Sequence, residues 1–195
     1  MRVFVALDID DSIRARLATF LDGVRGFSPE ARWVRPESMH VTLKFIGEKP
    51  AEVVEEIKQS LSGIRAGTIE ISFRGYGFFP TSKAPRVFWI GIAAGPQLAA
   101  LAKSVDEATA VLGVPQEEHD FSPHLTLARR GSGAPHWRKG DRAGAANSFQ
   151  RLQEKLAAMP ALEFGTMTAR EFFLYQSQLH PGGAKYTKIG RFGLE

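Results

Sequence analysis

The sequence contains no cysteine, which excludes disulfide bonds, thiolate nucleophiles and cysteine-based zinc sites. It also lacks any apolar run approaching the roughly 20 residues that a membrane-spanning helix needs. Residues 1–8 lack the long apolar stretch and the small-residue cleavage site of a secretory signal. These absences predict a soluble, cytoplasmic protein with no membrane partner.

The charge of the chain is mixed, with 25 Lys and Arg against 21 Asp and Glu and a net charge of +4. The excess of positive charge modestly favours an anionic partner such as nucleic acid or phosphate. The length of 195 residues suits one large domain or two small lobes. Bulk properties alone therefore leave the function open.

Hydrophobic periodicity predicts a mixed protein with many strands, of the α+β or α/β class. Helices are expected over residues 10–24, 51–61, 97–112 and 148–158. Strands are expected over residues 2–8, 39–46, 68–77, 86–94, 121–130, 162–168, 171–178 and 186–191. The glycine at position 47 is expected to end the second of these strands.

A tetrapeptide of the form His-x-Thr-Leu occurs twice, at residues 40–43 and again at residues 124–127. The copies are 124 − 40 = 84 residues apart, and each lies on a predicted strand with helices on both sides. This repeat predicts a single domain, residues 1–195, of two pseudo-symmetric intertwined lobes that face each other across a cleft.

Side chains of a strand alternate between its two faces, so His40 and Thr42 share one face. His124 and Thr126 share a face in the same way, and the apolar residues between them point into the core. The pattern therefore presents two imidazoles and two hydroxyls on rigid backbone, a suitable support for catalytic groups.

These groups suit phosphodiester hydrolysis, which needs a base for the attacking water and an acid for the leaving alkoxide. Imidazole titrates near neutral pH, so one histidine can be neutral while the other is charged. Threonine hydroxyls can donate hydrogen bonds to the phosphate oxygens. A lone histidine on a strand is usually structural, but two in matching contexts favour catalysis. The other histidines, His119, His136 and His180, have no ligand spacing, so no metal site is predicted.

Four stretches of the chain, residues 2–8, 33–47, 121–129 and 173–186, resemble in the same order the two-histidine (2H) phosphoesterase superfamily. Within it they resemble the bacterial and archaeal RNA 2′,3′-cyclic phosphodiesterases, also called 2′-5′ RNA ligases. The resemblance implies a bilobal α+β fold in which two antiparallel sheets face a central groove and helices pack outside. It implies no cofactor and no obligate protein partner, so a monomer is expected.

The resemblance further implies an RNA partner with a 2′,3′-cyclic phosphate end, which is hydrolysed to a 2′-phosphate. The bond to the 3′ oxygen is then the one that breaks. His40 is expected as the general acid and His124 as the general base, with Thr42 and Thr126 holding phosphate oxygens. Because the site is pseudo-symmetric, the two histidines can exchange roles.

Two more site residues follow from the resemblance, Arg129 as a phosphate contact and Phe45 as an aromatic near the base or ribose. Each lies five residues after a motif histidine, and in a regular strand that odd offset points away from the histidine face. Both reach the site only if the strand geometry breaks, and parity alone favours Arg130. A solvated Arg129 and a core position for Phe45 are the alternatives.

Weaker candidates lie outside this set. Arg35 can be a solvated side chain, and Tyr186 can close a sheet edge. The basic segment 129–147 can follow an RNA backbone or simply connect a strand to a helix.

Three other functions are left open by the sequence: a 2′-5′ RNA ligase acting on tRNA-half-like ends, a phosphodiesterase for small cyclic nucleotides, and a noncatalytic RNA-end-binding protein.

Overall fold

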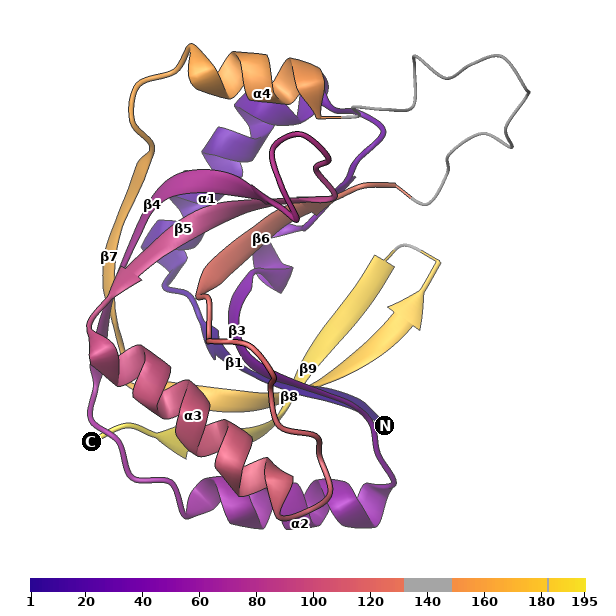
Figure 1. Cartoon of the computed structure of the whole chain (residues 1–195), viewed down its shortest axis with the longest axis vertical. Coiled ribbons are helices and arrows are strands. Elements are labelled where there is room, and N and C mark those ends of the chain that lie inside the picture. The colour runs from indigo at the N-terminus through magenta and orange to yellow at the C-terminus, as the bar shows by residue number, and fades with distance from the viewer. Residues whose placement is uncertain (132–148, 182) are drawn as a thin grey trace.

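The computed structural model describes residues 1–131, 149–181 and 183–195. These residues form two antiparallel sheets that lie on either side of a central gap, and helices cover the outer face of each sheet (Figure 1). The predicted α+β arrangement of two sheets with external helices is confirmed. None of the helices in the described ranges is both long and apolar enough to cross a membrane.

The four-stranded sheet has the order β3-β1-β8-β9. Its strands are β1 (Arg2–Asp8), β3 (His40–Glu48), β8 (Glu171–His180) and β9 (Gly183–Gly193). Helix α3 (Pro96–Ala110) contacts β3, and α2 (Ala51–Ser62) contacts both α3 and β9. In Figure 1 these two helices lie below the sheet, away from the central gap.

Strand β1 lies inside this sheet, and the side chains on each of its two faces pack in a hydrophobic cluster. Val3, Val5 and Leu7 alternate into the main hydrophobic core. Phe4 and Ala6 point to the opposite face, where they form a second, smaller cluster with aromatic residues of β8. One face of the sheet therefore anchors the fold, and the other presents an aromatic surface to the gap.

The five-stranded sheet has the order β2-β6-β5-β4-β7. Its strands are β2 (Arg32–Trp33), β6 (His124–Arg129), β5 (Val87–Ala94), β4 (Ile69–Phe79) and β7 (Glu163–Ala169). Helix α1 (Asp11–Val24) contacts β7, and α4 (Gln150–Ala157) contacts the short 3₁₀ helix that follows α1. In Figure 1, α4 lies above this sheet and α1 runs behind it.

The two strands that carry the repeated tetrapeptide lie in different sheets, β3 in one and β6 in the other. They are not hydrogen-bonded to each other, yet residues of the two strands approach closely where the sheets meet. The fold therefore brings together two segments that are 124 − 40 = 84 residues apart in sequence.

The strand boundaries differ from the prediction at Gly47. This glycine does not end β3, which continues to Glu48. Gly47 has a φ of +88° beside a register shift in the pairing of β1 with β3, between Val3 and Phe4. Glycine adopts this left-handed conformation without a steric penalty, so the strand kinks and then pairs again.

Candidate active site

The two motif histidines are held in the same way. The Nδ1 atom of His40 lies 2.8 Å from the backbone oxygen of Ser38, and Nδ1 of His124 lies 2.8 Å from the backbone oxygen of Ser122. A neutral imidazole that donates from Nδ1 keeps an unprotonated Nε2, which can accept a proton. Each strand therefore supplies one imidazole with Nε2 as its working nitrogen.

The shared serine, two residues before each histidine, extends the repeat to Ser-x-His-x-Thr-Leu. The contact involves the backbone oxygen of the serine, so the serine side chain is not what orients the ring. The repeated serine is visible in the sequence, but only the structure shows that its backbone oxygen contacts Nδ1 of the histidine.

A β-bulge interrupts each motif strand at its leucine. In the pairing of β1 with β3, Lys44 and Thr42 oppose successive residues of β1, which leaves Leu43 as the extra residue. In the pairing of β5 with β6, Leu127 is left over in the same way. A bulge places two residues against one and resets the alternation of the strand.

The bulges bring Phe45 and Arg129 onto the histidine faces. Leu43 and Lys44 are both buried, and Phe45, the next residue, is 50% exposed. On β6, Leu127 and Ala128 are both buried, and Arg129 is exposed. The two bulges are therefore the breaks in strand geometry that let Phe45 and Arg129 reach the site. A core position for Phe45 is therefore wrong.

Parity alone favoured Arg130, and the bulge at Leu127 overturns that preference. Arg130 lies just beyond the end of β6, where its backbone N–H donates to the oxygen of Arg86. It does not line either of the cavities between the sheets described next.

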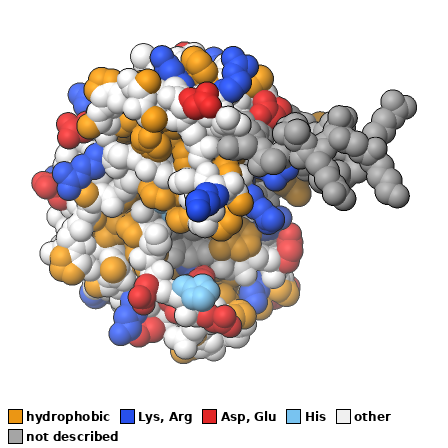
Figure 2. All heavy atoms as spheres, turned by 45° about the horizontal axis from the view of Figure 1, so that its top comes forward, with side chains coloured by type: hydrophobic (Ala, Val, Ile, Leu, Met, Phe, Trp, Pro, Cys, Tyr) orange, Lys and Arg blue, Asp and Glu red, His pale blue; other side chains and the backbone are white. Residues whose placement is uncertain are grey.

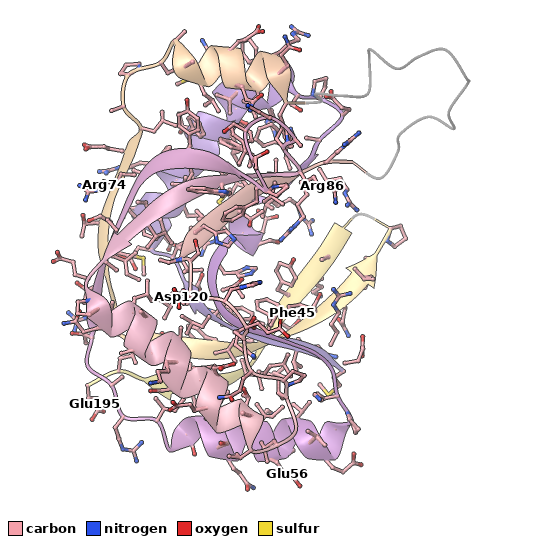
Figure 3. The ribbon with its side chains drawn as sticks, in the orientation of Figure 1. Phe45, Glu56, Arg74, Arg86, Asp120 and Glu195 are labelled. Atoms are coloured by element: carbon pink, nitrogen blue, oxygen red, sulfur yellow. The ribbon has the colours of Figure 1, made fainter. Side chains whose placement is uncertain are left out.

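Two cavities open between the sheets and meet at Thr42 and Phe45, which line both. The first, of about 450 Å³, is also lined by His40 and Arg129. The second, of about 670 Å³, is also lined by His124. Phe45 faces the space between the sheets in Figure 3. The two histidines and Arg129 thus border one continuous groove.

Figure 2 shows hydrophobic side chains gathered towards the middle of the visible face, with both positively and negatively charged side chains around them. Thr126 is half-buried on β6 and is not among the residues that line either cavity. Of the predicted site residues, it is the one that the structure does not place at the groove wall.

His40 lies in an aromatic environment. Its ring centroid is 4.7 Å from that of Phe4, 5.2 Å from that of Tyr186 and 6.0 Å from that of Tyr175. Burial lowers the pKa of His40 to about 4, although the Ser38 carbonyl and the Asp8 carboxylate oppose this shift. His40 is therefore neutral at pH 7.

Asp8 pairs directly with His40 across β1 and β3. Burial by itself raises the pKa of this carboxyl, but hydrogen bonds from Lys188 and Arg14 outweigh it and hold the pKa below its usual value. Arg14 Nη2 lies 2.7 Å from Asp8 Oδ1. Asp8 therefore stays ionised at neutral pH and places a negative charge behind His40.

His124 contacts a second aromatic group. Its ring centroid is 4.9 Å from that of Phe79 and 6.3 Å from that of Trp89. Trp89 packs over Gly77, and a Cβ atom added to this glycine would lie 2.2 Å from the indole ring. No sequence pattern marks Phe79 and Trp89 as site residues, because their contact with His124 arises only from strand pairing between β4, β5 and β6.

The weaker candidates have different outcomes. Tyr186, on β9, contacts the His40 ring and lines the first cavity, so it belongs to the site. Arg35 is exposed and its Nε lies 3.7 Å from a carboxylate oxygen of Glu37. Most of the basic segment 129–147, including His136, Trp137, Arg138, Lys139 and Arg142, lies outside the described residues.

No group of three or more His, Asp and Glu residues that could hold a metal ion occurs in residues 1–131, 149–181 and 183–195.

Comparison with known proteins agrees with this geometry. The family described as LigT like Phosphoesterase matches the chain twice, over residues 7–89 and residues 90–186. Each match contains one His-x-Thr-Leu motif.

Several relatives match over nearly the whole chain. The RNA 2′,3′-cyclic phosphodiesterase of Archaeoglobus fulgidus is 36% identical over 192 residues, which cover 98% of this chain and 99% of the relative. The protein of the same name from Methanothermobacter thermautotrophicus is 30% identical over 198 residues, which cover 100% of this chain and 99% of the relative.

Among solved structures, E. coli LigT complexed with 3′-AMP superposes with a TM-score of 0.76 at 26% identity, covering 99% of this chain and 97% of that one. The order of strands, the paired motifs and these matches lead to one conclusion: the chain belongs to the LigT-like phosphoesterase family.

Proposed function

We propose that this protein hydrolyses the 2′,3′-cyclic phosphate at the end of an RNA to a 2′-phosphate. The observation that carries the proposal is the matched pair His40 and His124, each with Nδ1 engaged by a backbone oxygen and Nε2 left for proton transfer. The relatives named RNA 2′,3′-cyclic phosphodiesterase support the choice of substrate.

In the proposed reaction, His124 Nε2 removes a proton from water while the water oxygen attacks phosphorus. The bond between phosphorus and the 3′ oxygen breaks, and His40 gives its proton to that oxygen. Thr42, which lines both cavities, donates a hydrogen bond to a non-bridging oxygen, and the Arg129 guanidinium balances the charge. Thr126 donates a second such hydrogen bond only if its hydroxyl reaches the phosphate from the His124 face of β6. The products are a 2′-phosphate and a 3′-hydroxyl, and each histidine contributes on the order of 10²- to 10⁴-fold.

The lowered pKa of His40 bears on this assignment. As the acid, His40 must take up a proton when the phosphate anion enters the groove, since nearby negative charge favours the imidazolium form. With its pKa lowered to about 4 by burial, His40 is neutral at pH 7, which suits a base. This observation favours a second arrangement in which the two histidines exchange roles and the substrate sits the other way round.

We also infer that the chain is a single domain of two pseudo-symmetric lobes. Three features support this inference. The family match occurs once in each half. Each motif strand has its bulge at the corresponding leucine. Each motif histidine binds the backbone oxygen of the serine two residues before it.

The test is to incubate an RNA that ends in a 2′,3′-cyclic phosphate with the protein, in the presence and absence of an RNA with a 5′-hydroxyl, and to resolve the products. A 2′-phosphate is expected. A 3′-phosphate would show that the bond to the 2′ oxygen breaks, and therefore that the substrate is seated the other way round. A joined product would indicate a ligase, and no product would indicate a noncatalytic RNA-end-binding protein.

The same assay tests the two histidines. His40→Ala and His124→Ala should each reduce turnover by about 10²-fold or more. Both variants should retain a cooperative unfolding transition, which shows that the loss is chemical. Full activity in either variant would place the chemistry elsewhere.

A further inference from the structure

The groove has a distinctly basic end. Next to the His40 cavity lies another cavity, of about 600 Å³, formed by β2 and the ends of β8 and β9. The two share Arg129, Leu179, Ala184 and Tyr186, so they form one continuous surface. We call it the arginine track, because the described residues that line it include Arg2, Arg32, Arg35 and Arg129 and no carboxylate.

The other end of the groove has no such excess of positive charge. The cavity beside His124 is lined by three carboxylates, those of Asp106, Glu117 and Asp120, and by two lysines, Lys44 and Lys103. Its buried lysine, Lys44, is neutralised by Asp106 and Glu117, at 2.5 and 3.2 Å. A nucleic acid strand that extends from the two histidines is therefore attracted more strongly towards the arginine track than towards the α3 side.

Arg32 and Arg129 are direct cross-strand neighbours in the pairing of β2 with β6. Like charges in this position repel each other and destabilise the pair. Within residues 1–131, 149–181 and 183–195, neither guanidinium has an ion pair with a carboxylate. The two guanidiniums lie side by side, so Arg129 can hold the reacting phosphate while Arg32 faces the next phosphate along the strand, and phosphate oxygens match the geometry of each.

The remaining lining of the track suits a nucleic acid strand. Tyr186 presents an aromatic ring, and Leu179 is 76% exposed beside it. Aromatic rings between positively charged side chains are the usual elements of a surface that binds single strands. Arg35 contributes less charge than Arg32, because Glu37 lies near it.

We propose that the RNA strand leading to the cyclic phosphate lies on the arginine track, and that Arg32, assisted by Arg35, contacts a phosphodiester upstream of the reacting end. This inference rests on the proposed function and deepens it. A terminal 2′,3′-cyclic phosphate has its neighbouring nucleotides only on its 5′ side, so any further phosphate must be upstream. Arg32 and Arg35 are thus specificity-determining residues that favour RNA ends over mononucleoside cyclic phosphates.

The test compares two substrates that share the reacting group: cytidine 2′,3′-cyclic phosphate, and a short RNA that ends in the same cyclic nucleotide. Arg32→Ala should lower kcat/KM for the RNA about tenfold, the effect of losing one charge-assisted hydrogen bond. The value for the mononucleotide should stay within about twofold. The logarithmic salt slope for the RNA should fall by about 1 for the lost phosphate contact.

The controls separate the track from general effects. Arg65 is exposed just after α2, away from the groove, and Arg65→Ala should leave both substrates unchanged. Arg32→Lys keeps the charge and should recover part of the RNA activity. Arg32→Ala combined with Arg35→Ala should lower the RNA value further.

Two outcomes would overturn the inference. An equal loss for both substrates would show that Arg32 acts on the reacting phosphate or on the fold. No loss for either would show that the RNA does not reach β2. Failure of the proposed function has a different result, because the unaltered protein would then turn over neither substrate. In that event, binding of the same RNA is measured by fluorescence anisotropy, and unchanged affinity in Arg32→Ala would refute the track.

Discussion

The lowered pKa of His40 leads to a quantitative prediction about stability and pH. The unfolded chain binds a proton at this imidazole with the ordinary pKa of 6.5, whereas the folded protein does so only near pH 4. Between these values the unfolded state binds more protons, so the free energy of unfolding must rise with pH. The contribution of His40 to the free energy of unfolding is fully present above pH 6.5 and is lost as the pH falls towards 4.

The size of the effect follows from the two pKa values. Going from pH 7 to pH 5, the contribution of His40 to the free energy of unfolding falls by about 2 kcal/mol, at 1.36 kcal/mol for each pKa unit. Urea denaturation at the two pH values measures it. His40→Gln removes the titrating group, so its loss of stability between the two pH values should be about 2 kcal/mol smaller.

The matched control is His180→Gln, because this side chain is exposed at the end of β8. Between pH 7 and pH 5, the free energy of unfolding of His180→Gln should fall by as much as that of the unaltered protein. An NMR titration supplies a direct check, since the sequence has only five histidines. A His40 midpoint near 6.5, or equal pH dependence in His40→Gln and the unaltered protein, would refute the argument that burial governs this imidazole.

Two further predictions concern residues behind the groove. Lys44→Ala removes a cation that is 2% exposed and leaves Asp106 without its partner, so the free energy of unfolding should fall by roughly 3 to 5 kcal/mol. A loss below about 1 kcal/mol in urea denaturation would contradict this, and Lys44→Met with Asp106→Leu should recover most of it. Gly77→Ala forces a Cβ atom into the Trp89 ring, so it should cost about 1 to 3 kcal/mol and lower kcat, because this ring packs against the histidine of β6. Gly26→Ala, where the added Cβ meets nothing within 4 Å, is the control and should change neither quantity.

Much of the fold could be predicted from the sequence because its local signals are strong. Apolar spacing located α1 through Ile13, Leu17 and Leu21, which are all buried on one face. Alternation located β1, and its predicted bounds, residues 2–8, are those of the structure. The repeated tetrapeptide identified both histidines, since a motif on a strand depends only on residue types and spacing.

The resemblance of four ordered stretches to a known superfamily predicted the two antiparallel sheets, because related sequences share a fold. The ends of elements were predicted less well. The predicted end of β3 at Gly47 and the predicted start of β9 at residue 186 were both wrong, because pairing with a partner strand extends each element beyond its local signal.

The resemblance named Phe45 and Arg129 as site residues, but only the tertiary structure shows how their side chains reach the histidine faces. Their odd offset from the histidines predicts the wrong face, and the bulges at Leu43 and Leu127 exist only because β3 and β6 pair with particular partners. A bulge depends on the register between two strands, and register is not a property of one strand's own sequence.

The electrostatic character of the groove likewise comes from the assembled fold. Arg32 and Arg129 are 97 residues apart (129 − 32), and only the pairing of β2 with β6 makes them neighbours. The low pKa of His40 depends on burial by Phe4 and tyrosines from the far end of the chain. The sequence by itself thus determined which groups carry the chemistry, while tertiary structure decided their surroundings, because burial and charge depend on residues that folding brings close.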